Sequence, residues 1–317
     1  MSVLIAHQYD ESLGLRVGAR LPAQTSYLAL GASPQTAWSV PPDAEILLVN
    51  QNSSAIGLDR TLARPSGWPF NLKWVHLRST GIDKYPDWVF EAPQVTVTRG
   101  GYATPIAEYV LTAMLAEAKN LPALWVSDRS KWTSCDVGAL AGQVLGIVGF
   151  GEIGRAIARR ALAFDMQVLG TRRGPGPSGM DGVDIVPFSR LLRQSDHVVI
   201  ATPLTEATRG LFDGSAFAQM KSGAHLINIG RGQVVDTDAL RHALDVRLGA
   251  ASLDVTDPEP PPAGHWLYTH PRVRLTPHIS GSSPHTEEVV TTFFLENLDR
   301  FLRGEVLVGL VDPARRY

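Results

Sequence analysis

Three polar residues in the second half of the chain could together bind and protonate a carbonyl compound while a hydride carrier reduces it. Arg231, Glu259 and His278 each follow shortly after an apolar run that is typical of a buried strand. An arginine can hold a carboxylate through two parallel hydrogen bonds, and a histidine can donate a proton near neutral pH. An acid beside the histidine can orient its ring and stabilise its charged form. This set of groups suits hydride transfer to a 2-oxo acid.

A glycine-rich turn earlier in the chain suits the binding of a hydride carrier. Val148 is followed by Gly149-Phe150-Gly151-Glu152-Ile153-Gly154. Gly149 permits a tight turn, Gly151 lets backbone amides approach a pyrophosphate, and Gly154 lets the next helix lie close to the sheet. Because the turn lies between an expected strand and an expected helix, it favours a dinucleotide site over an ordinary strand-to-helix turn.

The residues after the next expected strand indicate which dinucleotide is bound. Arg172 stands 18 residues beyond Gly154, where an NAD site usually carries an acid for the ribose 2′-hydroxyl, and Arg173 follows it. Two guanidiniums suit a 2′-phosphate, so we expect NADP(H) to be preferred, with NAD(H) possible. The alternative is a solvated strand end whose two arginines bind nothing.

The pattern from Gln143 onward alternates regularly between strands and helices, which predicts a Rossmann-type doubly wound parallel sheet. The expected strands are 144–148, 167–171, 197–201, 225–229, 250–255 and 272–276. The expected helices are 152–164, 188–193, 214–220 and 237–246, the last capped by Asp236. Arg231, Glu259 and His278 then follow the carboxyl ends of strands, which is the edge where such sheets bind ligands.

The first hundred residues predict a smaller flavodoxin-like α/β domain, with strands at 2–6, 45–50, 73–77 and 94–98. A helix with Thr104 as its N-cap and Pro105 in its first turn should run to Asn120 and connect the domains. An amphipathic helix after Pro284 should end at Gly304 and return to the first domain. We therefore expect a substrate domain of residues 1–100 plus 286–317 and a dinucleotide-binding domain of residues 101–285, with a cleft between them.

Composition excludes several other classes of protein. The chain has 317 residues, with 29 Lys plus Arg against 31 Asp plus Glu, so a net charge of −2 gives no general attraction for nucleic acid or an anionic membrane. The only cysteine is Cys135, which excludes an internal disulfide framework, and the histidines show no metal-binding spacing, so we expect no metal. Without a leader-like N-terminus or a long apolar run, a cytoplasmic protein is expected.

Beyond about residue 70 the sequence resembles the D-isomer-specific 2-hydroxyacid dehydrogenases. The motifs that carry the resemblance are the turn 149–154 and the stretches LINIGRGQVVD (226–236), LDVTDPEPP (253–261) and LTPHISG (275–281). Thr202-Pro203-Leu204-Thr205, Ala107-Glu108 and Asn297-Leu298 also match. The resemblance is greatest to glyoxylate and hydroxypyruvate reductases, and it implies an oxidoreductase that converts small 2-oxo acids to D-2-hydroxy acids.

The resemblance also implies roles for individual residues. It makes His278 the general acid, Glu259 its partner, and Arg231 the residue that binds and orients the substrate. It places the cofactor beside Gly149, Gly151, Glu152, Ile153, Gly154, Thr202, Pro203, Ile229, Asp254 and Gly281, in addition to Arg172 and Arg173. The loop Ser79-Thr80-Gly81 resembles the one whose backbone amides receive the substrate carboxylate, although an ordinary turn is the alternative.

The sequence departs from the family pattern at two places, and two other functions are alternatives. Arg172 replaces the acid of NAD-dependent members, and Thr98-Arg99-Gly100-Gly101 differs from the usual residues before the connecting helix. Formate dehydrogenase is disfavoured because it carries Gln in place of Glu259. A dinucleotide-sensing, corepressor-like binding protein of the same fold is the other rival. The resemblance suggests a homodimer, in which Trp132 either reaches the neighbouring subunit's site or packs as a core or interface aromatic.

Overall fold

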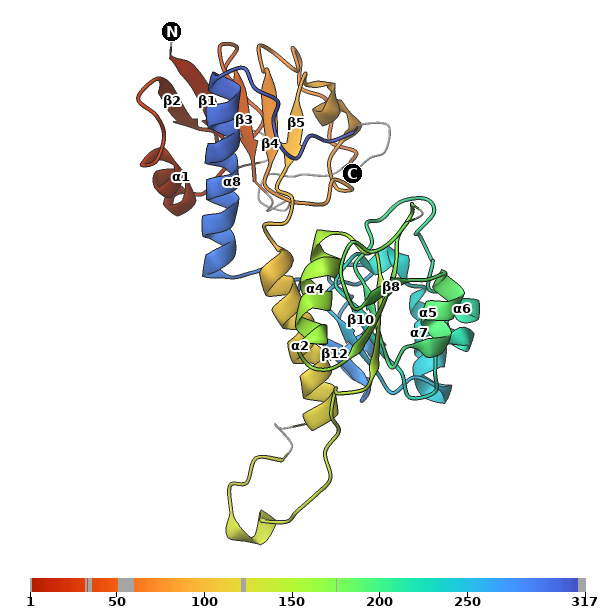
Figure 1. Ribbon diagram of the computed structural model, residues 1–317. Helices are drawn as coiled ribbons and strands as arrows, with labels where there is room; N and C mark the ends of the chain where they lie inside the picture. Colours follow the sequence, from red (N-terminus) through yellow and green to blue (C-terminus); the bar gives the residue numbers. More distant parts are fainter. Residues whose placement is uncertain are drawn as a thin grey trace. The chain divides into compact units, whose positions relative to one another are not determined.

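The computed structural model describes residues 2–31, 33, 36–50, 60–120, 124–174 and 176–312. The chain forms two compact units, one of Met1–Gly101 with Pro284–Tyr317 and the other of Tyr102–Ser283 (Figure 1). Each unit is built around its own parallel sheet, with five strands in the first and seven in the second. This confirms the predicted α/β class with two parallel sheets.

The first unit has the strand order β2-β1-β3-β4-β5, which is the order of flavodoxin-like sheets. Its strands are β1 (Val3–His7), β2 (Thr25–Ala29), β3 (Ile46–Val49), β4 (Trp74–Leu77) and β5 (Val95–Val97). The sequence did not predict β2. It is an edge strand in which most side chains are partly or fully exposed, so it lacks the buried apolar run that marks β3 and β4.

Two helices cover one face of this sheet, as Figure 1 shows. Helix α1 (Glu11–Gly18) and helix α8 (Pro284–Leu302) bury Leu13, Phe294 and Leu298 against Ile5 and Trp74. After α8 the chain runs antiparallel to β5, where the amide of Val97 donates to the Gly309 carbonyl over 3.0 Å. The C-terminal segment therefore packs on the first unit, as predicted.

The second unit has the strand order β12-β11-β10-β9-β6-β7-β8, in which the order reverses between β9 and β6 as in a Rossmann fold. Its strands are β6 (Val144–Val148), β7 (Gln167–Thr171), β8 (Val183–Ile185), β9 (His197–Ile200), β10 (His225–Asn228), β11 (Ala250–Leu253) and β12 (Val273–Leu275). The short edge strand β8 was not predicted, because Val183, Asp184 and Ile185 form too short a run.

Helices cover both faces of this second sheet (Figure 1). Helices α2 (Ala103–Lys119) and α4 (Glu152–Leu162) lie on one face, and α5 (Phe188–Gln194), α6 (Gly214–Gln219) and α7 (Thr237–Val246) lie on the other. Short 3₁₀ helices occupy Arg129–Lys131, Gly232–Val234 and Trp266–Tyr268 in this unit, and Asp87–Glu91 in the first unit. The doubly wound arrangement is therefore complete on both sides of the sheet.

The two predicted helix caps have different outcomes. The carboxylate of Asp236 accepts hydrogen bonds from the amides of Asp238 and Ala239, which confirms it as the N-cap of α7. The prediction that Thr104 caps α2 is wrong. Tyr102 is the N-cap residue and makes no side-chain cap hydrogen bond. Thr104 is the second residue of the helix and therefore does not hold the N-cap position, from which a side chain accepts from amides two or three residues later.

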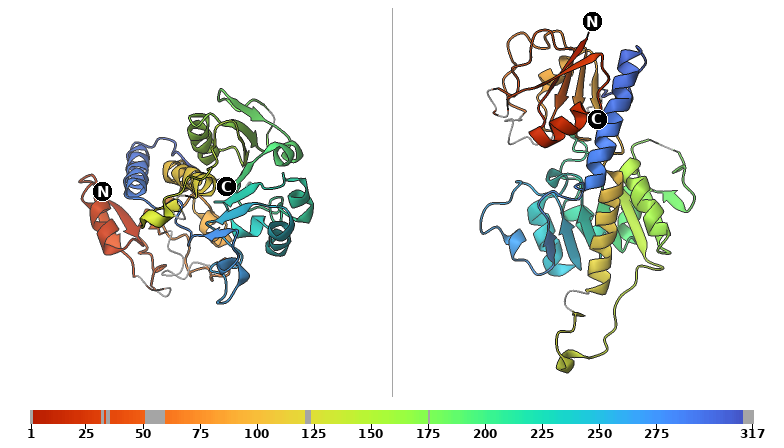
Figure 2. Two further views of the ribbon diagram at one scale, coloured as in Figure 1. Left: turned by 90° about the horizontal axis from the view of Figure 1, so that it is seen from below. Right: turned by 90° about the vertical axis from the view of Figure 1, so that its left-hand side faces the viewer.

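Residues 124–139, which we call the arm, extend away from α2 and the sheet of the second unit (Figure 2). Every side chain of the arm is exposed, including Trp125 at 74% and Trp132 at 81%. The amide of Gly138 donates to the Ala118 carbonyl at the base of the arm. Within the described residues, no helix has the length and apolar character needed to span a bilayer.

Buried histidines predict that the fold is sensitive to acid. Burial lowers the pKa of His76 and of His225 to about 3, and that of His197 to about 4. A histidine in the unfolded chain has a pKa of about 6.5, so the folded protein binds fewer protons between that value and about 4. The free energy of unfolding should therefore fall as the pH drops through this window.

Urea unfolding at about pH 7.5 and about pH 5 measures the effect. We expect each fully buried histidine to cost about 1 to 2 kcal/mol of stability at the lower pH. Carboxylates titrate mostly below this window, so they contribute little to the difference. Equal free energies of unfolding at the two pH values would show that these imidazoles are not buried in the neutral form.

Candidate active site

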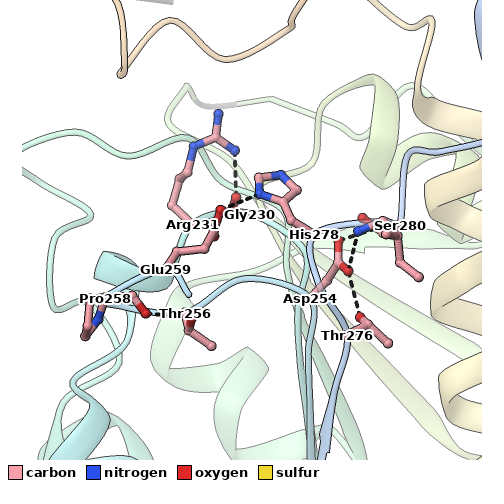
Figure 3. Close-up of polar contacts among 10 residues, drawn as sticks. Gly230, Arg231, Asp254, Thr256, Pro258, Glu259, Thr276, His278 and Ser280 are labelled. Carbon is pink, nitrogen blue, oxygen red and sulfur yellow. Dashed lines mark hydrogen bonds and ion pairs between the residues drawn. The ribbon is translucent and has the colours of Figure 1, made fainter. Parts of the chain in front are cut away.

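Arg231, Glu259 and His278 lie together beyond the ends of β10, β11 and β12 (Figure 3). Arg231 lies between Asn228 and the 3₁₀ turn that begins at Gly232. The guanidinium of Arg231 donates to the Gly230 carbonyl over 2.8 Å. The buried side chain of Asn228 holds this loop, because it donates to the Arg231 carbonyl over 3.0 Å and accepts from the Gly230 amide over 3.1 Å.

Close packing explains the glycine that follows Arg231. A Cβ atom on Gly232 would lie 2.0 Å from the backbone of Thr256, so a side chain cannot fit there. Thr256 lies in the loop that carries Glu259, and its hydroxyl donates to the Pro258 carbonyl over 2.8 Å. The Arg231 loop and the Glu259 loop are therefore in direct backbone contact at this position.

Glu259 and His278 are joined by a hydrogen bond of 2.8 Å between Oε1 and Nδ1. The two side chains are 29% and 36% exposed, so they are accessible to a small molecule while partly shielded from water. A carboxylate accepts hydrogen bonds only, so Nδ1 carries a hydrogen toward Glu259. The other ring nitrogen, Nε2, is then the atom that can present a proton to a substrate.

His278 has a left-handed backbone conformation that Asp254 supports. Its φ angle is 54°, which is unfavourable for a residue with a side chain. Its amide donates to the carbonyl of Asp254 over 3.0 Å. The carboxylate of Asp254 accepts from the amides of Ile279 and Ser280 over 2.8 and 2.9 Å. Asp254 thus binds three consecutive amides of the histidine loop.

The glycine-rich turn has the geometry that a pyrophosphate needs. Gly149 has a φ of 101°, and a Cβ atom there would lie 2.7 Å from the backbone of Ala201. No atom lies within 4 Å of a Cβ atom built on Gly151, so this part of the turn is open. Gly151 is the N-cap residue of α4 and makes no side-chain cap hydrogen bond. The first amides of α4 can therefore bind an anion, which fits a dinucleotide.

The other predicted cofactor residues lie along the same edge of the sheet. The carbonyl of Thr202 lies 2.9 Å from a Cβ atom built on Gly230, and Pro203 follows it after β9. Ile229 is 7% exposed at the end of β10. Glu152 and Ile153 lie in the first turn of α4, and Gly281 follows the histidine loop. The ends of β6, β9 and β10 therefore meet where the strand order reverses, which is the usual ligand site of such sheets.

Arg172 and Arg173 are exposed and directly follow β7, the strand that pairs with β6 before the glycine-rich turn. The loop that follows them lies close to Arg172, because a Cβ atom on Gly176 would be 3.0 Å from its guanidinium. The same loop lies near Arg155 of α4, whose guanidinium is 5.4 Å from the ring centre of Phe150. Arg155 is a further cation beside this loop, and the sequence did not indicate it.

The loop Ser79-Thr80-Gly81 belongs to the first unit and follows β4. The Ser79 hydroxyl bonds to the Gly81 carbonyl and to Tyr85, and the Thr80 hydroxyl donates to the Thr98 carbonyl. Both side chains are therefore committed to holding the loop. Among the described residues, nothing accepts a hydrogen bond from the backbone amides of Thr80 and Gly81. Two such amides suit a carboxylate.

Several polar residues that hold the site carry no sequence motif that would have indicated their role. Asn228 supports the Arg231 loop, and Thr276 and Tyr109 extend the network of Asp254 through bonds of 2.7 Å. Asn228 could have been noticed, because it is a polar residue that ends the fully buried strand β10. Thr276 has no such signal, because the strand before it includes the exposed Arg274. Tyr109 has no such signal, because it lies within an apolar helix 167 residues before its partner.

Comparisons with known proteins agree with this arrangement. A profile of the D-isomer specific 2-hydroxyacid dehydrogenase NAD-binding domain matches residues 111–280. The human glyoxylate reductase/hydroxypyruvate reductase is 36% identical over 252 residues, which are 74% of this chain and 75% of that protein. D-3-phosphoglycerate dehydrogenase 2, chloroplastic, of Arabidopsis thaliana is 36% identical over 215 residues, which are 65% of this chain and 34% of that protein.

Solved structures agree over the whole chain. The structure of a D-isomer specific 2-hydroxyacid dehydrogenase from Xanthobacter autotrophicus Py2, in complex with NADPH and MES, covers 100% of this chain and 99% of its own. The two have a TM-score of 0.81 and 26% sequence identity. With the family profile and the relatives above, these matches show that the chain belongs to the NAD(P)-dependent D-isomer specific 2-hydroxyacid dehydrogenases.

Proposed function

We propose that this enzyme reduces glyoxylate, hydroxypyruvate or a similar small 2-oxo acid to the D-2-hydroxy acid, with NADPH preferred and NADH possible. The observation that carries the proposal is the hydrogen bond between Glu259 and His278 next to Arg231. The unit 102–283 is the dinucleotide-binding domain in this proposal. The unit formed by 1–101 and 284–317 is the substrate domain, and its loop 79–81 donates amides to the substrate carboxylate.

Each residue of the set has a separate task. Arg231 binds the carboxylate through parallel hydrogen bonds and thereby orients the neighbouring carbonyl carbon. His278 delivers the proton on Nε2 to the carbonyl oxygen, which becomes the hydroxyl of the product. Glu259 holds the ring through Nδ1 and stabilises its charged form before that transfer. The dinucleotide, when bound, supplies the hydride to the same carbon, so the two electrons and both hydrogens of the product are accounted for.

An assay of several 2-oxo acids with NADPH and with NADH tests the proposal. Glyoxylate, hydroxypyruvate and 3-phosphohydroxypyruvate should be compared, because the relatives include both a glyoxylate/hydroxypyruvate reductase and a phosphoglycerate dehydrogenase. We expect the highest kcat/KM with glyoxylate or hydroxypyruvate. A clear preference for the phosphorylated substrate would contradict the proposed substrate class while leaving the reaction type intact.

Cofactor preference gives a separate prediction, based on Arg172 and Arg173. Replacing both by alanine should weaken NADPH binding by about 1 to 3 kcal/mol, because charge-assisted hydrogen bonds to a 2′-phosphate are lost. NADH binding should change little, since NADH has no such phosphate. Fluorescence titrations of the parent and the double variant with NADPH and with NADH measure these binding free energies. Equal kcat/KM for NADPH and NADH in the unmutated enzyme would contradict the assignment.

A homodimer formed through the dinucleotide-binding domain is also part of the proposal. The exposed tryptophans of the arm, Trp125 and Trp132, support it, because large apolar side chains on a projecting segment mark an association surface. In the proposed dimer, the exposed Trp132 contacts the second copy of the chain. Sedimentation equilibrium over a range of protein concentrations tests whether two copies associate.

A further inference from the structure

A chain of hydrogen bonds joins helix α2 to the loop of His278. The Tyr109 hydroxyl lies 2.7 Å from Thr276 Oγ1, which lies 2.7 Å from Oδ1 of Asp254. Tyr109 is on α2, Thr276 follows β12 and Asp254 follows β11, all within the second unit. The chemistry of these groups determines which group donates and which accepts in each hydrogen bond. An ionised carboxylate can only accept, so Thr276 donates to Asp254 and must accept the hydrogen of Tyr109.

Asp254 in turn forms hydrogen bonds with the loop that carries His278. Its carbonyl accepts from the amide of His278, and its carboxylate accepts from the amides of Ile279 and Ser280. His278 has a φ of 54°, a conformation that persists only when the surrounding contacts enforce it. A small rotation of the Asp254 carboxylate would therefore move the backbone that carries the imidazole (Figure 3).

Burial of the residues in this hydrogen-bond series stabilises the bonds between them. Asp254 is 1% exposed, so an unmade hydrogen bond to its carboxylate is costly. Burial raises the pKa of the Tyr109 hydroxyl, and the charge of Asp254 raises it further, although the hydrogen bond with Thr276 opposes both. The Tyr109 hydroxyl therefore keeps its proton throughout the neutral pH range and donates it in the hydrogen bond to Thr276. The Thr276 hydroxyl has a single hydrogen, which it donates to Asp254.

We propose that Tyr109 and Thr276 are positioning residues that fix the orientation of His278 through Asp254. The inference rests on the proposed role of His278 as the proton donor. Neither residue needs to touch the substrate or the cofactor for this role, so they should affect the rate of the chemical step and leave binding nearly unchanged. Transfer of a proton is sensitive to small errors in donor position, which is why a distant hydroxyl can matter.

Substitutions that remove single hydroxyl groups test the proposal. Tyr109→Phe should lower the single-turnover rate of hydroxypyruvate reduction about three- to tenfold, because one hydrogen bond is lost. Thr276→Val should lower it about ten- to hundredfold, because it leaves both Asp254 and Tyr109 short of a partner. Thr276→Ser keeps the hydroxyl and should restore most of the rate. In all three, KM for the substrate and the Kd for NADPH should stay within about twofold of the parent.

A second readout in the absence of cofactor separates positioning from a loss of stability. In protein labelled with ¹³C at the Cε1 position of histidine, the His278 signal is the one missing from a His278→Asn variant. This signal should shift or broaden in Tyr109→Phe and Thr276→Val, and should return in Thr276→Ser. Tyr27→Phe is the matched control, because the buried Tyr27 hydroxyl has no hydrogen-bond partner among the described residues.

The possible outcomes distinguish this inference from the proposed function. If Tyr109→Phe and Thr276→Val keep the parent rate and the parent His278 signal, the positioning role is wrong. It is also wrong if Thr276→Ser behaves like Thr276→Val, or if the rates fall while the signal stays in place. His278→Ala is assayed in parallel. If that variant retains the parent rate, the proposed role of His278 fails first, whatever the Tyr109 variant does.

Discussion

His278→Ala should lower the single-turnover rate of 2-oxo acid reduction by about a hundredfold to ten-thousandfold, the usual contribution of a positioned general acid. Reduction consumes a proton at the substrate oxygen, and His278 is the titratable group that Glu259 holds beside Arg231. Without the imidazole, water must supply this proton from an unfixed position. Stopped-flow absorbance of NADPH, measured with the cofactor already bound, follows the step directly.

Binding of NADPH should survive this change, because the glycine-rich turn and α4 are untouched. His242→Ala is the matched control, since His242 is exposed on α7. It should retain the parent rate and the parent affinity for NADPH. A His278→Ala variant that reduces substrate as fast as the parent would exclude His278 as the proton donor.

Arg231→Ala should lower kcat/KM for glyoxylate by about a hundredfold or more, because a paired, charge-assisted set of hydrogen bonds is lost. Arg231→Lys keeps the charge and loses the planar fork, so it should still lower kcat/KM by at least about tenfold. Both variants should bind NADPH with nearly the parent affinity. Steady-state kinetics and a cofactor titration give the two numbers independently.

Arg190→Lys provides the control for a conservative arginine change. Arg190 is a surface residue of α5 that bonds only to the side chain of Gln194 and to the backbone of its own helix turn, among the described residues. It should leave kcat/KM unchanged. If Arg231→Lys were equally silent with every 2-oxo acid tested, Arg231 would not be the residue that binds the carboxylate.

The parts of the fold that the sequence predicted are those with strong local patterns. Strands β6 and β7 have the predicted boundaries, because each is a five-residue run between clear turn signals. Strands β2 and β8 were missed, because both lie at sheet edges, where one neighbour and partial exposure suffice. The start of α2 was misplaced, since a favourable cap residue such as Thr104 is only one of several ways to begin a helix.

The site was predictable where residue type alone limits the possibilities. Arg231, Glu259 and His278 were found because they follow strands that end at one edge of the sheet. Tyr109 was out of reach, because its bond to Thr276 depends on how α2 packs across the sheet. Arg155 was also missed, since its position beside the loop after β7 depends on the path of that loop, which residue types do not determine.

The most direct test of the proposed reaction is a single turnover, in which enzyme saturated with NADPH is mixed with less hydroxypyruvate than there are active sites. We expect one NADPH to be oxidised for each molecule of hydroxypyruvate and the product to be D-glycerate. Chiral chromatography identifies the enantiomer, and absorbance at the NADPH band gives the stoichiometry. Binding of NADPH without oxidation, or formation of L-glycerate, would contradict the account.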